Sequence, residues 1–390
     1  MRKLFAALSV AALIALPAFA QEFEFSGEIK TGVYWESVQK GDDKAKVTTV
    51  MHNNDDAGGG SGENRSQGRL RLNFHYKHDN MGLKLRFEKT AWDNNDSAQV
   101  SWKSFPYVYI YGNFLDEQIK VSAGRLSDSP WGMGGPEKWD TLEDELTKNI
   151  AVRTEIMPAF VPGLDIGFVL NGWNGGFSDT LSEKNIPGLL QESVLGVAYN
   201  HDYFGIRLAY RLDSMTDKSN TSSLPLPGSN EGEDLIYRVE ERFLQNLLPG
   251  FQIWANGKYN YINCGEAFGL AYTNWLYVQY APALFTAQFR FGYDGAESEG
   301  DKRDVIHARG SFYYNILSFL SAGASAYYAQ DYGLKISPDS PFSAWHIEPK
   351  VKLTLGDSYI EFVYHYGNEY VQKDMEEKTH WANLRLVYTF

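Results

Sequence analysis

Apolar and polar side chains alternate along much of the chain, with the period of two that is typical of a β-strand with one apolar face. In residues 69–77, for example, leucine or aromatic residues hold the even positions and polar or charged residues hold the odd ones. The alternation predicts about eighteen strands, or sixteen if one hairpin is miscounted. They cover 23–35, 66–78, 82–90, 104–114, 118–125, 150–158, 163–172, 192–200, 204–213, 233–243, 251–261, 268–281, 285–293, 304–315, 319–329, 343–355, 358–367 and 379–390.

The connections between these strands alternate in length. Hairpin-sized turns are expected at 79–81, 115–117, 159–162, 201–203, 281–283, 316–318 and 356–357, with a slightly longer one at 245–250. Mostly long, polar segments lie between them, such as 40–65, 126–149, 173–191, 214–232 and 294–303. A membrane barrel sorts short turns and long loops to opposite ends in this way, whereas a β-sandwich has no reason to. The pattern predicts an all-β fold, a transmembrane up-and-down antiparallel β-barrel forming one domain over residues 21–390.

The first twenty residues have the organisation of a cleaved secretory signal. Arg2 and Lys3 are followed by an apolar stretch at 4–16 and by Ala18-Phe19-Ala20, a small-residue cleavage site. Beyond this segment no run reaches the roughly 18 consecutive apolar residues of a spanning helix. A membrane location would therefore require a closed barrel, because every backbone polar group in lipid needs a partner.

The chain ends on a strand whose last residue is aromatic. Leu384, Leu386, Tyr388 and Phe390 occupy one face of it. Alone, this stretch would also fit the edge strand of a soluble sheet. Together with the signal and the strand order, it resembles the bacterial outer-membrane β-barrel porins. That resemblance implies a cell outer membrane location, contact with outer-membrane lipid, recognition of the C-terminal strand by the barrel-assembly machinery, and passage of small hydrophilic solutes. Monomers and homotrimers are both compatible with it.

Composition narrows the partners. The chain has 49 acidic and 36 basic residues, a formal net charge of −13, which argues against nucleic acid as a partner. Aromatic residues make up 15% of the chain, in keeping with a barrel that is apolar outside and polar inside. The single cysteine, Cys264, excludes an internal disulfide.

The charged face of each strand is expected to line the lumen, because Lys or Arg at the bilayer midplane costs ~2 to 4 kcal/mol. Eighteen basic residues fall on that face against eight acidic ones. This excess predicts a preference for anions, although individual cations could simply pair with neighbouring carboxylates. Glu241 points outward in this register and indicates a rim position or a shifted boundary. The pore-lining basic residues include Arg69, Arg71, Lys84, Arg86, Arg207, Arg211, Arg290, Arg309, Lys350, Lys352 and Arg385.

The connection 126–149 is a candidate constriction loop. It contains the turn formers of residues 129–136 and then a capping-box-like start to a short helix at Thr141. Its position resembles the inward-folded third outer loop of general porins. By that resemblance Asp140, Glu143, Asp144 and Glu145 form the acidic side of the constriction, and Arg69, Arg71, Lys84 and Arg86 form the basic side. The alternative is a loop that only covers the mouth of the barrel.

Three classes of function compete. A passive diffusion channel biased toward anions follows from the basic wall. A sugar-specific porin follows if the aromatic residues expected inside form a stacking track; they are Tyr34, Trp254, Trp275, Tyr277, Tyr313, Tyr327, Tyr359 and Trp381. A barrel-anchored adhesin could use the long segment 40–65. An enzyme is not expected, since the eight histidines are scattered and neither G-x-S-x-G nor H-E-x-x-H occurs. The sequence also predicts no cofactor and no metal site.

Overall fold

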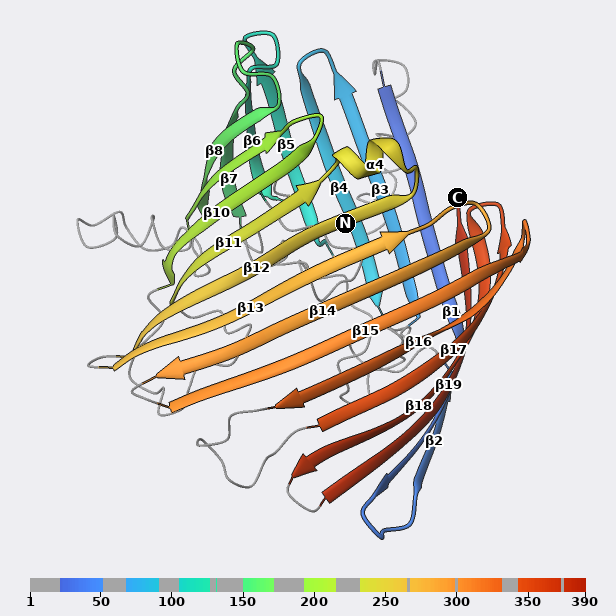
Figure 1. Cartoon of the computed structure of the whole chain (residues 1–390). Helices are drawn as coiled ribbons and strands as arrows, with labels where there is room; N and C mark the ends of the chain where they lie inside the picture. The colour runs from blue at the N-terminus through green and yellow to red at the C-terminus, as the bar shows by residue number, and fades with distance from the viewer. Residues whose placement is uncertain are drawn as a thin grey trace, which may run out of the picture.

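The computed structural model describes residues 22–51, 68–90, 105–126, 131, 150–171, 193–214, 232–264, 267–298, 301–331, 343–372 and 375–390. They form one 19-stranded antiparallel sheet and a short helix, α4 (Phe243–Leu247), shown in Figure 1. The predicted signal, residues 1–20, lies outside this part of the chain. The strands are β1 (Glu22–Lys40), β2 (Lys46–Met51), β3 (Arg69–His78), β4 (Met81–Thr90), β5 (Tyr107–Phe114), β6 (Ile119–Arg125), β7 (Ile150–Ile156), β8 (Leu164–Asn171), β9 (Val194–Asn200), β10 (Phe204–Ser214), β11 (Gly232–Glu241), β12 (Phe251–Cys264), β13 (Ala267–Tyr280), β14 (Phe285–Ser298), β15 (Asp301–Leu317), β16 (Leu320–Asp331), β17 (Ser343–Leu355), β18 (Ser358–Gln372) and β19 (Met375–Thr389).

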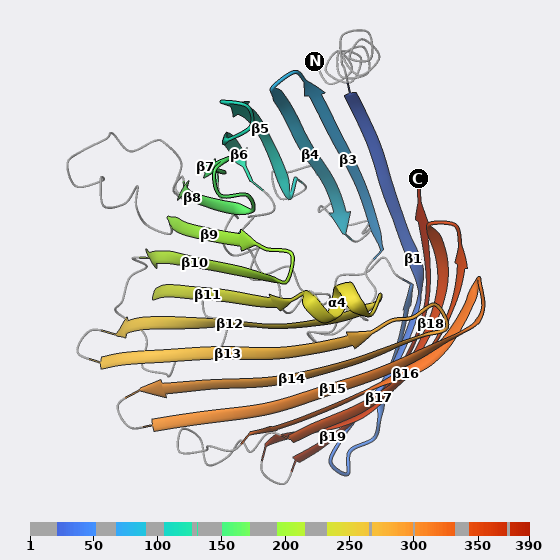
Figure 2. The same ribbon diagram turned by 45° about the horizontal axis from the view of Figure 1, so that its top comes forward.

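The sheet closes on itself through β1. One edge of β1 pairs with β19, and the other edge pairs with β3 over its first half and with β2 over its second half. Strands β3 to β19 follow one another in chain order, and Figure 2 shows them curving round to β1. The ring therefore has eighteen strands, with β2 an extension beside β1. The predicted up-and-down barrel is confirmed, while β2 lies in a segment that was predicted to be loop.

The C-terminal residue, Phe390, extends the pairing of β19 with β1 that closes the barrel. Phe390 exchanges two backbone hydrogen bonds with Gly27, donating at 3.1 Å and accepting at 2.8 Å. Its ring lies 5.8 Å from that of Phe25 on the outer face. A Cβ at Gly27 would overlap the Phe390 ring, so glycine makes room for the terminal side chain. The last strand thus closes the barrel, as its resemblance to porin terminal strands implied.

The short turns join the strands at the end where both termini lie. Three consecutive non-glycine residues with positive φ, Leu115 to Glu117, make the β5–β6 turn. The predicted turn at 245–250 is instead the one-turn helix α4 followed by a short loop. Glu241 accepts a hydrogen bond from the backbone N–H of Leu244 at 2.7 Å, which places its carboxylate at the rim. Among the described residues, no helix is long and apolar enough to cross a bilayer.

The two faces of the sheet differ as the alternation predicts. Apolar side chains such as Ile110, Ile166, Phe289 and Phe362 point outward and are 45 to 54% exposed. Most of the buried residues, charged ones included, face inward. Within the described ranges, buried apolar residues form clusters on the inner wall and no core between two layers of structure.

Candidate functional site: the inner wall of the barrel

The basic residues of β3 and β4 lie on the inner wall, but two of the four predicted for the constriction are held by carboxylates. Arg69 donates through Nε to Glu28 at 2.9 Å, and Arg71 donates to Glu88 at 2.7 Å. Arg86 donates to Asn73 at 2.7 Å and lies over the Tyr107 ring at 4.8 Å. Among the described residues, neither Arg86 nor Lys84 has a carboxylate within ion-pair distance. The field of this cluster is thus partly cancelled.

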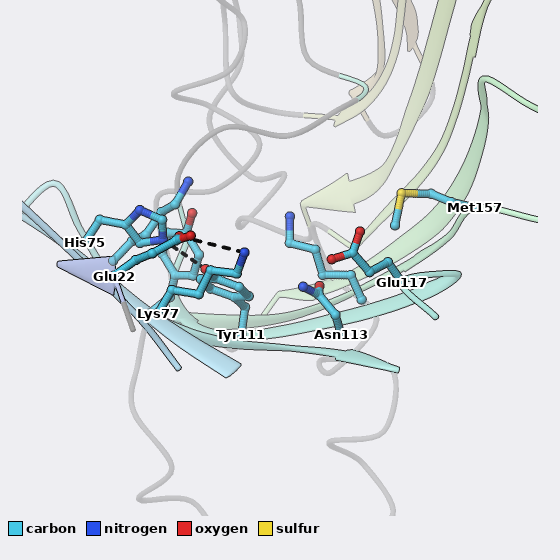
Figure 3. Close-up of a pocket in the computed structure, with 10 residues that line it drawn as sticks. Glu22, His75, Lys77, Tyr111, Asn113, Glu117 and Met157 are labelled. Atoms are coloured by element: carbon cyan, nitrogen blue, oxygen red, sulfur yellow. Dashed lines mark hydrogen bonds and ion pairs between the residues drawn. The ribbon is translucent and has the colours of Figure 1, made fainter. Parts of the chain in front are cut away.

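Lys84 lines a cavity of about 370 Å³ near the end of the barrel with the short turns (Figure 3). Three lysines line it, Lys77, Lys84 and Lys120, each on a different strand. Lys77 lies 3.8 Å from Glu22, and Lys120 lies 3.5 Å from Glu155. The other lining residues are Glu22, His75, Tyr109, Tyr111, Asn113, Glu117 and Met157. The cavity is a polar recess lined by three lysines and two glutamates, Glu22 and Glu117.

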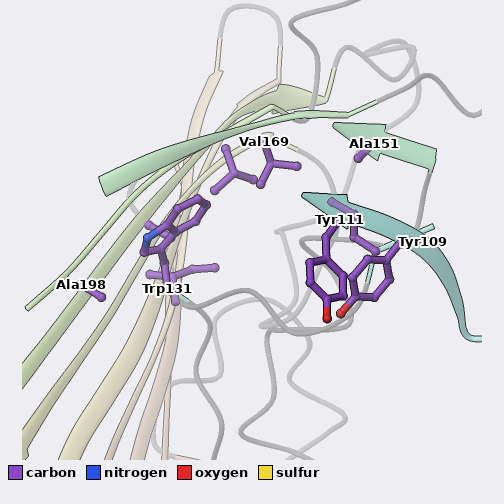
Figure 4. Packing of buried hydrophobic residues seen from close by; sticks show 10 residues of the cluster. Tyr109, Tyr111, Trp131, Ala151, Val169 and Ala198 are labelled. Carbon is purple, nitrogen blue, oxygen red and sulfur yellow. The ribbon is translucent and has the colours of Figure 1, made fainter. Parts of the chain in front are cut away.

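The candidate constriction loop contributes one described residue beyond Leu126. Trp131, which Figure 4 shows among the buried hydrophobic residues, is fully buried. It packs against the inward-facing glycines of β8 and β9, Gly167 and Gly196. Its indole N–H donates to Asp165 at 3.3 Å. A Cβ at either glycine would overlap the indole, so the absence of a side chain at these two positions leaves the space that the indole occupies. Trp131 therefore lies inside the barrel. The predicted acidic residues of the loop, Asp140, Glu143, Asp144 and Glu145, lie outside the described residues, and the constriction stays a prediction.

At two places on the inner wall, an arginine of one strand is directly opposite an arginine of the neighbouring strand. Arg207 of β10 is in register with Arg238 of β11, and Arg290 of β14 is in register with Arg309 of β15. Like charges in this position destabilise a sheet. Arg290 also lies 3.8 Å above the ring of Trp275. Arg211, further along β10, is buried on the same face. Carboxylates offset part of this charge, since Arg238 lies 3.8 Å from Glu240 and Arg309 lies 3.2 Å from Glu348.

Strands β17 to β19 carry a group of three cations around one buried carboxylate. Glu361 is buried between Lys350, at 3.4 Å, and Arg385, which donates a hydrogen bond to it. Lys352 lies 4.0 Å above the ring of Tyr359, which Arg385 also approaches. Three predicted pore-lining cations therefore gather around one carboxylate, and the local charge stays positive.

A row of rings crosses the inner wall from β13 to β1. We call it the ring belt; it consists of Trp275, His307, Tyr327, His346, His365, Trp381 and Tyr34. Consecutive centroids are 3.9 to 6.5 Å apart. The aromatic members were predicted to face inward. The histidines between them were not recognised as a group, although His346 and His365 meet Glu348 within the belt and are a possible ligand set for a metal.

The eight predicted inward carboxylates are not the complete set. Glu36 is buried and accepts a hydrogen bond from Tyr34 at 3.0 Å, and Asp294 lies 3.1 Å from His307. Both lie just past the predicted ends of their strands, at 35 and 293. The excess of basic residues on the wall is therefore smaller than the sequence count.

Comparison with known proteins bears on the fold. The chain matches no family model and no curated protein sequence. Among solved structures it is similar to OpdQ of Pseudomonas aeruginosa, with 9% identity, a TM-score of 0.53 and coverage of 95% of this chain and 99% of that one. It is also similar to the outer membrane channel DcaP of Acinetobacter baumannii (10% identity, TM-score 0.52, coverage 95% and 97%). It is similar as well to a BenF-like porin from Pseudomonas fluorescens Pf-5, with 10% identity, a TM-score of 0.52 and coverage of 95% of this chain and 99% of that one. At these identities the likeness concerns the fold alone, and it agrees with the closed barrel.

Proposed function

We propose that this chain is an outer-membrane porin, a passive diffusion channel for small hydrophilic solutes with a bias toward anions. In this proposal residues 1–20 direct secretion and are cleaved, the barrel-assembly machinery recognises the C-terminal strand, and the apolar outer face contacts lipid. The protein carries out no chemical reaction. The porins and channels named among the similar structures support the proposal through their shared fold.

One observation carries the anion bias: three cations, Lys350, Lys352 and Arg385, surround the single carboxylate of Glu361 on the inner wall. Fixed positive charge along an aqueous path lowers the barrier to anions and raises it for cations. The opposed arginines of β14 and β15 also lie on this wall, with the charge of Arg309 partly offset by Glu348.

The test is conductance in planar bilayers under a salt gradient, with the reversal potential reporting the ratio of anion to cation permeability. We expect anion preference, and we expect Lys350→Gln to reduce it. Lys378→Gln is the matched control, because it removes the same charge from a side chain that is 46% exposed and lies on the outward face near the start of β19. Cation selectivity in the wild type, or equal effects of the two variants, would contradict the anion bias.

A sugar-specific channel is the second candidate, and the ring belt favours it. Rings of the belt that are only partly buried, such as Trp275 and Tyr327, can stack on the faces of sugar rings, whereas Tyr34 and Trp381 are buried. In the same bilayer experiment, block of the current by an added oligosaccharide would support this alternative. Absence of any conductance would favour a barrel that only anchors adhesive loops.

A further inference from the structure

We propose that His346, Glu348 and His365 form a binding site for a divalent transition-metal ion of the Zn²⁺ class. The site lies on the inner wall where β17 and β18 pair. The proposal goes beyond the channel function and does not depend on it.

The three side chains already converge. Their candidate ligand atoms all lie within 4.8 Å of one another, and within the described part of the chain no other three such groups do so. His365 Nδ1 is 3.1 Å and His346 Nε2 is 4.0 Å from the same oxygen, Glu348 Oε1. Ligand atoms of a tetrahedral zinc site are about 3.4 Å apart. A small movement of the His346 ring therefore completes a three-ligand site.

The neighbouring rings hold both imidazoles in place. Tyr327 stacks on His346 at 4.8 Å with 20° between the planes. Trp381 stacks on His365 at 4.9 Å and 11°. Restraint of this kind matters because supporting contacts fix the orientation of metal ligands and contribute to affinity.

The carboxylate is oriented as well. Glu348 Oε2 accepts hydrogen bonds from Ser325 Oγ and from Arg309 Nη2, each at 3.2 Å. These two contacts occupy Oε2 and turn Oε1 toward the imidazoles. The Arg309 charge opposes a second cation nearby, so we expect weaker affinity than in a closed structural zinc site.

Gly367 keeps the space between the imidazoles open. It is directly opposite His346 in the β17–β18 register. A Cβ at this position would lie 2.7 Å from His365 Nε2 and 2.9 Å from His346 Cβ. Any larger residue would displace one of the two rings.

The donor set selects the class of ion. Two imidazole nitrogens and one carboxylate oxygen suit zinc, copper or nickel, whereas magnesium and calcium prefer oxygen ligands alone. Three protein ligands leave a fourth position for water. His346 is 19% exposed, so the site is open to the lumen.

The experiment is a titration of the untagged, chelator-treated protein in detergent with Zn²⁺, against a zinc-sensitive competitor dye. We expect one ion per chain and no competition from Mg²⁺ or Ca²⁺. His346→Gln and His365→Gln should each weaken binding about tenfold or more, and Gly367→Ala should weaken it by displacing a ring. His307→Gln is the matched control. His307 lies on the same ring belt and has one carboxylate partner, Asp294, but belongs to no three-ligand group among the described residues.

Each variant is first checked for the heat-dependent gel mobility of a folded barrel. Folded His346→Gln and His365→Gln proteins that bind Zn²⁺ as tightly as the wild type would overturn the proposal, as would the absence of stoichiometric binding to the wild type. The titration needs no membrane current. A failed metal site and a failed channel are therefore separate results.

Discussion

The barrel has two regions of different construction. Strands β3 to β9, the short-strand region, have 7 to 10 residues each. Strands β12 to β19, the long-strand region, have 12 to 17. The short-strand region buries Trp131 on its inner wall, together with small apolar residues. The long-strand region carries most of the ring belt.

The charges differ in the same way. In the short-strand region Arg69, Arg71 and Arg153 each have a carboxylate beside them. In the long-strand region Lys350 and Arg385 share Glu361. The first region packs a loop residue and pairs these three arginines one by one, while in the second Lys350 and Arg385 depend on one carboxylate and Lys352 lies beside them. We infer that the short-strand region mainly supports the barrel and that the long-strand region sets its selectivity.

The largest effect is expected from Trp131→Ala. Removing the indole leaves a cavity above Gly167 and Gly196, and Trp→Ala in a packed site costs about 3 to 5 kcal/mol. Denaturant unfolding in detergent would measure the loss. Trp345→Ala is the control, because this side chain of β17 lies on the outward face. A cost no larger than the control's would mean that Trp131 contributes no packing to the short-strand region.

Much of the barrel follows from short-range pattern. Period-two alternation and turn residues gave the eighteen strands of the ring, the short turns and the inward aromatic residues, because each depends on neighbours along the chain. Strand ends were less accurate. Glu36 and Asp294 were missed because both faces of a strand become polar toward the outer loops, so alternation no longer marks the boundary. The strand β2 and the helix α4 were missed because their segments were assigned to a loop and a turn.

Side-chain contacts between strands are harder to predict from the sequence than the strands themselves. The pairing of Arg69 with Glu28 depends on register across a 41-residue separation. The meeting of His346 with His365 was within reach, since the tight turn at 356–357 sets Leu355 opposite Ser358 and so brings His346 opposite Gly367. Ligand spacing within one strand does not show this group, because two of its ligands lie on β17 and the third on β18.

The second effect concerns the buried carboxylate of the long-strand region. Glu361→Gln leaves Lys350, Lys352 and Arg385 without its charge, and removal of one partner from a buried ion pair costs about 3 kcal/mol. Glu88→Gln, in the short-strand region, should cost about 1 kcal/mol or less, because Arg71 and Glu88 remain partly accessible to solvent. Parallel denaturant titrations would measure both. Equal costs would remove the proposed difference between the regions.

A third effect tests the predicted constriction. Replacing Arg69, Arg71, Lys84 and Arg86 together by glutamine should lower the ratio of anion to cation permeability, measured from the reversal potential. Adding Glu28→Gln and Glu88→Gln removes the partners of the first two arginines. The selectivity change that persists then belongs to Lys84 and Arg86. If none persists, these residues do not line the constriction.

The smallest change in stability and selectivity is expected when both partners of one ion pair are replaced together. Arg71→Gln with Glu88→Gln leaves the net charge of the wall unchanged, and exchanges a partly exposed pair for two amides of similar size. The unfolding free energy should change by about 1 kcal/mol or less, and the reversal potential should stay at the wild-type value. Lys350→Gln with Glu361→Gln is the corresponding pair in the long-strand region. It also preserves net charge but removes a carboxylate that Arg385 shares, so it should destabilise the barrel more. A shift in reversal potential with the first double variant alone would place selectivity in the short-strand region and reverse the assignment made above.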